Sequence, residues 1–142
     1  MNRIVLVSTI IGIIIGVSFA VFYVVYLVEM HSLTIPEGTN FTLYVSNQSV
    51  DNRLANIKVR IDDNLKVDQD FDVGNQHQVY PFYFKLSQGE HLVQVDAKDA
   101  SHQKEFTIDS ELWMAIAYWY DKDDHESPMI LVDVSDGPIG FQ

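Results

Sequence analysis

The 142-residue chain contains no cysteine. A disulfide framework is therefore excluded, and so is a membrane anchor made from a lipid-modified cysteine. An ordinary apolar core must stabilise the fold. The roughly 110 residues that follow the first apolar run are enough for one such domain and too few for two.

Positive charge is scarce as well. Nine lysines and arginines stand against 20 aspartates and glutamates, which gives a net charge of −11. From residue 29 onward the balance is 8 − 20 = −12, because Arg3 is the one charged residue before Glu29. Phosphate backbones and anionic lipids repel a domain of this charge, so we expect no nucleic-acid partner.

Motifs of reaction chemistry are also missing. The sequence has no G-x-S-x-G, no H-E-x-x-H and no phosphate-binding glycine loop. Its five histidines lack the close pairing typical of zinc ligands; they are His31, His77, His91, His102 and His125. Pairs of carboxylates arise by chance among 20 acidic residues and do not predict a hydrolase. We therefore expect no enzyme and no cofactor.

One segment, residues 4–28, has no charge at all. As a helix, its 25 residues would span roughly 37 Å, which exceeds the ~30 Å hydrocarbon core of a bilayer. We predict a single uncleaved transmembrane helix, a signal anchor. The alternative is a secretory signal peptide cleaved after Ala20, but the apolar region of such a peptide should be only about 7 to 15 residues long.

The flanks of this segment predict its orientation in the cell membrane. Arg3 precedes it and an acidic region follows, so we expect residues 1–3 in the cytoplasm and the C-terminal part outside. Tyr23 and Tyr26 lie near the outer end, where tyrosine rings favour the headgroup level. With Arg3 they form the predicted membrane-interface set.

Small residues recur at every fourth position of the predicted helix, and a G-x-x-x-G lies among them. They are Ser8, Gly12, Gly16 and Ala20. Such a stripe lets two helix backbones approach closely, which predicts association with a second copy or with another membrane protein. The alternative is a helix that only anchors the chain in the bilayer, because glycine and alanine are common in membrane helices.

After a tether of residues 29–38, the segment 39–142 alternates apolar and polar residues between turn signals. This pattern predicts an all-β, immunoglobulin-like or transthyretin-like sandwich of seven or eight strands. The inward-facing sets are Phe41/Leu43/Val45, Ile57/Val59/Ile61, Val67/Phe71/Val73, Tyr80/Phe82/Phe84/Leu86, Val93/Val95/Ala97, Phe106/Ile108, the run 112–120, and Ile130/Val132/Val134.

Three features refine this pattern. The sequence IDDNLKV predicts a tight hairpin, because Asp and Asn tolerate left-handed backbone. Pro81 predicts that its strand lies at a sheet edge or begins after the proline. The run 112–120 also suits a short helix, but its apolar and aromatic density on both faces favours a buried central strand.

Residues 59–97, VRIDDNLKVDQDFDVGNQHQVYPFYFKLSQGEHLVQVDA, resemble PEGA and carboxypeptidase-regulatory-like domains in their strand, turn, strand and L-x-x-G-x-H pattern. The resemblance implies a small extracytoplasmic β-sandwich that acts as an adhesive or accessory module. It implies no functional residue.

Two acidic clusters are candidate calcium sites. Asp68, Asp70 and Asp72 alternate along one predicted strand, so their side chains project from one face about 6.5 to 7 Å apart. They form either a cation-binding ladder or a charged edge that prevents aggregation. The second cluster follows an aromatic run and comprises Asp121, Asp123, Asp124 and Glu126. A solvated loop is the alternative there, because the pattern departs from an EF-hand.

Aromatic residues supply the other candidate site. A binding patch for glycan or protein could comprise Trp113, Tyr118, Trp119 and Tyr120, although such residues more often form a core. Asn40 and Asn47 each begin an N-glycosylation acceptor pattern.

We expect a single-pass membrane protein whose outer domain binds another membrane or envelope protein without catalysis. A surface module for glycan or Ca²⁺ is the alternative.

Overall fold

The computed structural model describes residues 17–18, 20–25, 35–74, 78–124 and 127–140. Two compact units divide the chain, Met1–Pro36 and Glu37–Gln142. In the first unit, residues 17–18 and 20–25 are helical. Within the described parts of the chain, no helix combines the length and apolar character needed to cross a bilayer. Most of the predicted anchor, residues 4–28, lies outside the described residues and stays a prediction.

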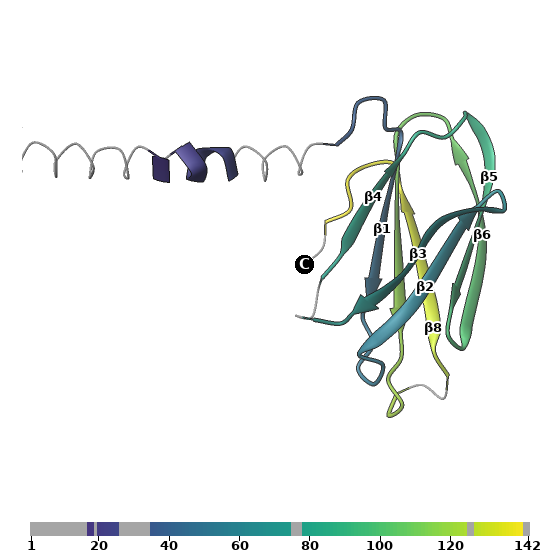
Figure 1. Ribbon diagram of the computed structural model, residues 1–142. Coiled ribbons are helices and arrows are strands. Elements are labelled where there is room, and N and C mark those ends of the chain that lie inside the picture. Colours follow the sequence, from purple (N-terminus) through teal and green to yellow (C-terminus); the bar gives the residue numbers. More distant parts are fainter. Residues whose placement is uncertain (1–16, 19, 26–34, 75–77, 125–126, 141–142) are drawn as a thin grey trace, which may run out of the picture. The chain divides into compact units, whose positions relative to one another are not determined.

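The second unit is a β-sandwich of two four-stranded sheets (Figure 1). We call them sheet A, with strand order β4-β1-β7-β8, and sheet B, with order β3-β2-β5-β6. Their strands are β1 Phe41–Asn47, β2 Leu54–Ile61, β3 Asn64–Asp72, β4 Tyr80–Phe84, β5 Gly89–Ala97, β6 Ala100–Ile108, β7 Leu112–Trp119 and β8 Met129–Ser135. The prediction of an all-β sandwich of seven or eight strands is confirmed.

The core lies between the sheets and takes alternate residues of each strand, because successive side chains of a strand point to opposite faces. In β7, for example, Leu112, Met114, Ile116 and Tyr118 are buried, whereas the residues between them are half-buried on the other face. The largest fully buried side chains include Tyr118, Phe41 and Phe71. Phe71 contacts Tyr80 and Phe82 edge to face, which joins sheet B to sheet A.

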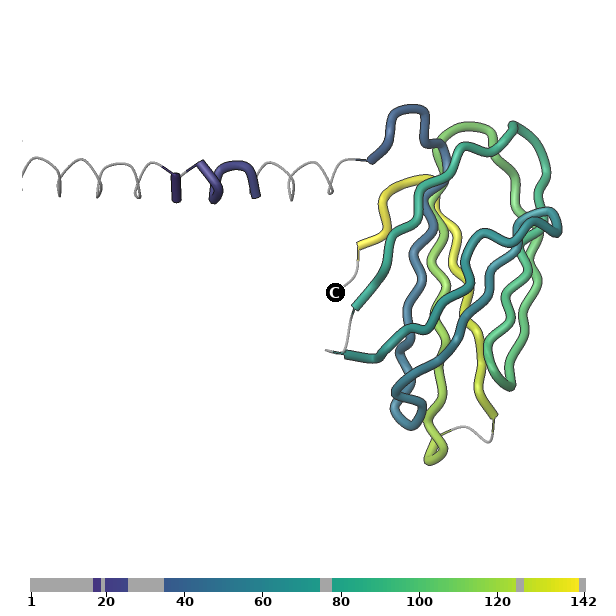
Figure 2. The backbone as a smooth tube through the Cα atoms, viewed as in Figure 1, coloured from purple at the N-terminus to yellow at the C-terminus, as the bar shows by residue number. Residues whose placement is uncertain are grey.

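Tight turns connect the strands of sheet B (Figure 2). Asp62 and Asp63 both have positive φ, 49° and 63°, and close the β2–β3 hairpin, which confirms the turn predicted from IDDNLKV. Lys98 has a φ of 36° in the short β5–β6 turn. Gly89 begins β5 with a φ of 118°, a conformation that only glycine adopts without strain.

Pro81 lies within β4, at the edge of sheet A, which confirms the edge prediction. The strand begins before the proline, at Tyr80. The run 112–120 is a strand, β7, and it lies between β1 and β8. Three predicted strand ends extend too far: Val73, Leu86 and Tyr120 fall just beyond β3, β4 and β7. At the opposite edge, Lys104 Nζ of β6 donates to the Val132 carbonyl of β8 over 3.2 Å, which links the two sheets.

Candidate functional site

The outer face of sheet A carries aromatic and apolar side chains and almost no charge. Strand alternation places thirteen described positions on it, and we call them face A: Thr42, Tyr44 and Ser46 of β1, Pro81 and Tyr83 of β4, Trp113, Ala115, Ala117 and Trp119 of β7, and Met129, Leu131, Asp133 and Ser135 of β8. Asp133 is the one ionisable carboxylate among these positions. An outer sheet face without lysine, arginine or glutamate is unusual for a chain in which 20% of residues are charged.

The register of the strands gives face A its internal order. Thr42 lies between Tyr83 and Trp113, and only 3% of it is exposed, so large neighbouring side chains cover it. Ala117 lies between Ser46 and Leu131. Ser46 is 5% exposed, whereas Leu131 at the margin is 53% exposed. Face A therefore has a closely packed centre of small residues with larger side chains beside it.

Two tyrosines on face A lie close enough to influence each other. Burial raises the pKa of the Tyr44 hydroxyl above 10.0, and the neighbouring Tyr83 raises it further. Tyr44 pairs in register with Pro81, next to Tyr83. The Tyr44 hydroxyl therefore remains neutral at physiological pH.

The outer face of sheet B is charged instead, and ion pairs join its strands. Arg60 Nη1 lies 2.9 Å from Asp96 Oδ2, and Lys58 Nζ lies 3.5 Å from Asp68 Oδ2. A shallow hollow of about 640 Å³ lies beside Lys58 and Asp96. Its lining combines charges of both signs with Leu54 and three alanines. The outer face of sheet B thus carries ion pairs between strands, whereas the outer face of sheet A carries almost no charge.

The predicted aromatic patch is divided by the structure. Trp113 and Trp119 lie on face A, as a binding patch requires. Tyr118 does not: it is fully buried in the core, and its hydroxyl accepts a hydrogen bond of 2.7 Å from Asn52 Nδ2, so including it in an exposed patch was wrong. Alternation along β7 explains the division, because Tyr118 has the opposite orientation to both tryptophans. Tyr120 lies beyond the strand and packs partly against the core.

The predicted aspartate ladder lies on β3, an edge strand of sheet B. Each carboxylate has a partner on the protein. Lys58 pairs with Asp68 at 3.5 Å, Asn56 Nδ2 donates to Asp70 Oδ1 over 3.1 Å, and Arg53 lies 3.7 Å from Asp72. Among the described residues, no three acidic or histidine side chains converge on a possible metal position. The arrangement suits the charged-edge interpretation, and the calcium interpretation stays a prediction.

The predicted acidic loop begins with a local turn. Asp121 Oδ1 accepts the Asp123 amide over 3.0 Å, and the Asp121 carbonyl accepts the Asp124 amide. Asp123 and Asp124 are exposed. The fourth predicted ligand, Glu126, lies outside the described residues.

Hydrogen bonds tie this loop to the β1–β2 connection. The Tyr120 carbonyl accepts from Ser49 Oγ and from the Val50 amide, both over 2.8 Å. Asp51 accepts the Lys122 amide over 2.8 Å and pairs with Lys122 Nζ at 3.3 Å. The backbone hydrogen bond from Lys122 is the main reason that the pKa of Asp51 is lowered below 3.8. This end of the sandwich is therefore held by polar contacts.

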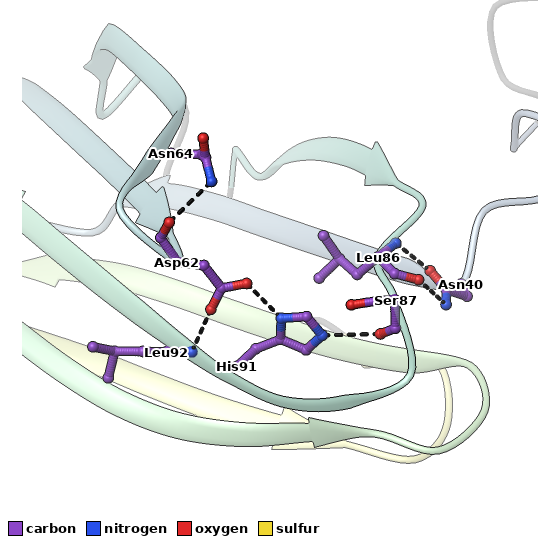
Figure 3. Close-up of polar contacts among 7 residues, drawn as sticks. All are labelled: Asn40, Asp62, Asn64, Leu86, Ser87, His91 and Leu92. Atoms are coloured by element: carbon purple, nitrogen blue, oxygen red, sulfur yellow. Dashed lines mark hydrogen bonds and ion pairs between the residues drawn. The ribbon is translucent and has the colours of Figure 1, made fainter.

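The asparagines of both N-glycosylation acceptor patterns make hydrogen bonds within the folded domain. Asn47 is 2% exposed, and its Nδ2 donates to the carbonyls of Asn52, Arg53 and Phe71 over 2.9, 3.3 and 3.0 Å. Asn40 Nδ2 donates to the Leu86 carbonyl over 3.0 Å (Figure 3). The folded domain thus occupies both amide nitrogens with internal hydrogen bonds.

At the end of the sandwich that carries the β2–β3 turn, a buried histidine contacts an aspartate (Figure 3). His91 Nδ1 lies 2.6 Å from Asp62 Oδ2, and His91 Nε2 lies 2.9 Å from the Ser87 carbonyl. Both neighbours are acceptors when Asp62 is ionised, so the imidazolium form of the ring, with a proton on each nitrogen, satisfies both contacts. The ring also stacks on Phe106 at 5.5 Å.

Electrostatics agree with this protonation state. Burial lowers the pKa of His91, but the hydrogen bonds to Asp62 and Ser87 and the charge of Asp62 outweigh burial and hold it above 6.5. The hydrogen bond from His91, with that from the Leu92 amide, lowers the pKa of Asp62 below 3.8. The pair lies at a sandwich end away from face A and stabilises the β2–β3 turn.

Sequence reasoning missed most of face A and the ion pair of His91. Tyr44 and Leu131 belong to face A, and His91 belongs to the ion pair. A signal for Tyr44 existed, since it alternates with the inward-facing Leu43 and Val45. No signal paired His91 with Asp62, because that contact depends on how β5 aligns with β2.

Comparisons with protein-family models, with curated proteins and with solved structures found no match.

Proposed function

We propose that this chain is a membrane-anchored module that binds another membrane or envelope protein through face A, without catalysis. The observation that carries the proposal is the unequal distribution of charge over the two sheets. Sheet B displays paired charges, whereas face A displays tyrosine, tryptophan, methionine and leucine with a single aspartate. Depletion of charge with enrichment of aromatic residues and methionine is typical of the centre of a protein interface.

A protein fits face A better than a glycan does. Sugar recognition needs aromatic rings together with polar groups that fix the hydroxyls. On face A, Thr42 and Ser46 are almost completely buried, which leaves few polar groups beside the rings. Trp113, Trp119 and Tyr44, by contrast, are side chains of the kind that dominate binding energy between proteins.

The membrane part of the proposal rests on the uncharged segment 4–28 and on Arg3 before it. We also propose that the sandwich belongs to the immunoglobulin-like or transthyretin-like kind, with the PEGA-like pattern of residues 59–97 covering β2 to β5. Both fold groups supply accessory domains outside the membrane, which agrees with the proposed role.

Site-specific photo-crosslinking in native membranes tests the proposed function. A benzophenone amino acid replaces Leu131, which is 53% exposed on face A, or Glu105, which is exposed on the outer face of sheet B. We expect the chain with the probe at 131 to form a discrete adduct with a second protein. The probe at 105 serves as the matched control and should form none.

A substitution completes this test. Ala117→Arg places a charge next to Leu131, its register partner on β8, and should reduce the adduct at least about tenfold, because a desolvated unpaired charge costs several kcal/mol. Equal adducts from both probe positions, or an adduct that Ala117→Arg leaves unchanged, would contradict the proposal. Retention on immobilised glycan without any protein adduct would favour the alternative module.

A further inference from the structure

We infer that the protein surface that docks on face A is apolar at its centre and lined at its margin by lysine and arginine. This inference rests on the proposed function and names the chemistry of the partner. It follows from the carboxylates that lie beside face A. Neither the sequence motifs nor the fold alone indicates it.

Carboxylates lie beyond both ends of β7, which is one of the two inner strands of sheet A. Glu111 precedes β7 immediately and is exposed. Asp123 and Asp124 follow the other end of β7 and are exposed as well. Neither they nor Glu111 makes an ion pair with a described residue. Together with Asp133 within face A, these residues form what we call the acidic rim.

No ion pair between described residues reaches the acidic rim. Arg53, Lys58 and Arg60 pair with carboxylates of sheet B. Lys122 lies near the rim but pairs with Asp51 at 3.3 Å. Sheet B balances part of its charge in this way, and its Glu90 and Glu105 are exposed without an ion pair to a described residue; the acidic rim likewise stays negative and available to a partner.

Charge complementarity therefore selects the occupant. A second copy docked symmetrically through face A would bring two identical acidic rims together, and each domain already carries a formal charge of −12 by the balance above. An anionic lipid surface is repelled for the same reason. A partner with an apolar centre and a basic margin satisfies both the face and its rim.

The test compares two double charge reversals in the full chain, each with the photo-crosslinker at position 131. The rim variant is Glu111→Lys with Asp124→Lys. The control variant is Glu90→Lys with Glu105→Lys, which makes the same change in net charge at exposed positions on the outer face of sheet B. Adduct yield is measured in membranes washed at 50 and 500 mM salt, and the mass of the adduct is recorded.

We expect the rim variant to lose at least about fivefold in adduct yield at low salt and the control variant to stay within about twofold. Yield from the unmodified chain should fall as salt rises, because the screening length shortens from about 10 Å at 0.1 M to about 3 Å at 1 M. Similar losses from both variants, or no loss from either, would overturn the inference, and so would an adduct with the mass of two copies.

These outcomes separate the inference from the function beneath it. If Ala117→Arg removes the adduct while the rim variant keeps it, the partner docks on face A but lacks a basic margin. If Ala117→Arg has no effect, face A is not the docking surface and the proposed function is wrong.

Discussion

At the scale of single residues, Asn47 joins the two sheets through one amide group. The residue ends β1 of sheet A, and its Nδ2 reaches the Phe71 carbonyl of β3 in sheet B. Its Oδ1 accepts the Ser49 amide over 3.0 Å, so every polar atom of the side chain has a partner. A buried amide that is fully bonded in this way specifies one arrangement of its neighbours.

Asn47→Asp should destabilise the domain strongly. The carboxylate has the same shape, but it cannot donate to the carbonyls of Asn52, Arg53 and Phe71, and burial without donors is costly. We expect a loss of about 3 kcal/mol or more and a melting temperature lower by roughly 10 °C or more. Tryptophan fluorescence of the full chain in detergent measures it, since both tryptophans lie on β7.

The matched control for this prediction is Gln103→Glu. It makes the same amide-to-carboxylate change at an exposed position of β6. Its melting temperature should stay within about 2 °C, because exposed substitutions usually change stability by less than about 0.5 kcal/mol. A similar small effect for Asn47→Asp would mean that Asn47 does not hold the sheets.

At the scale of elements, the ion pair between His91 and Asp62 joins β5 to the β2–β3 turn. Asp62 also accepts the Leu92 amide over 3.0 Å through its Oδ1, so the carboxylate receives hydrogen bonds on both oxygens. The Ser87 carbonyl holds the other side of the imidazole ring. Protonation of His91 is therefore coupled to the packing of the turn.

Stability of the domain should fall as pH rises through the pKa of His91. That pKa is raised on folding, so its stabilisation is complete below about 6.5 and is lost above the folded value. The pKa of Asp62 is lowered, so its stabilisation is present above 3.8 and is lost only in acid. We expect a lower melting temperature at pH 9 than at pH 6.

Two variants check the origin of this pH dependence. His91→Phe keeps a ring that can stack on Phe106 and removes the titrating group, so it should flatten the change between pH 6 and 9. His102→Phe, at a half-exposed position of β6, should leave it unchanged. An unchanged slope in His91→Phe would assign the pH dependence to other groups.

Much of the element structure could be predicted from local patterns, because alternation and turn chemistry act within a few residues. The inward faces of β1, β2 and β5 and the Asp62–Asp63 turn were all predicted correctly. The pairing of strands was not, since β1 and β7 are parallel neighbours about 70 residues apart, with Val45 opposite Ile116. Alternation defines a face but does not identify the strand beside it.

The same reasoning explains the errors at the candidate site. Tyr118 was grouped with its aromatic neighbours because they are adjacent in sequence, but adjacent strand residues point to opposite faces. Face A as a whole depends on four strands meeting in one register, and only the structure supplies that register. The acidic loop suggested ligands, whereas Asp121 closes a turn.

At the scale of the whole molecule, the buried core of the residues that the structure describes lies in the second unit, between Phe41 and Ile130. Both sheets supply this core, and none of the described helical residues contributes to it. A core of this kind needs no membrane segment to form. We therefore expect residues 37–142 to fold alone, with the anchor deciding only where the domain resides.

Removing the first 36 residues should separate these two properties. Residues 37–142 should stay in the supernatant after alkaline extraction, whereas the full chain should stay with the membranes, because insertion of the 25-residue uncharged segment is strongly favoured. Both should melt within about 3 °C of each other by tryptophan fluorescence.

The full chain with Gly12→Ile and Gly16→Ile should still pellet with membranes but lose helix association. Release of the full chain by alkali would show that the segment is no anchor, and the sandwich would then bind its partner from solution.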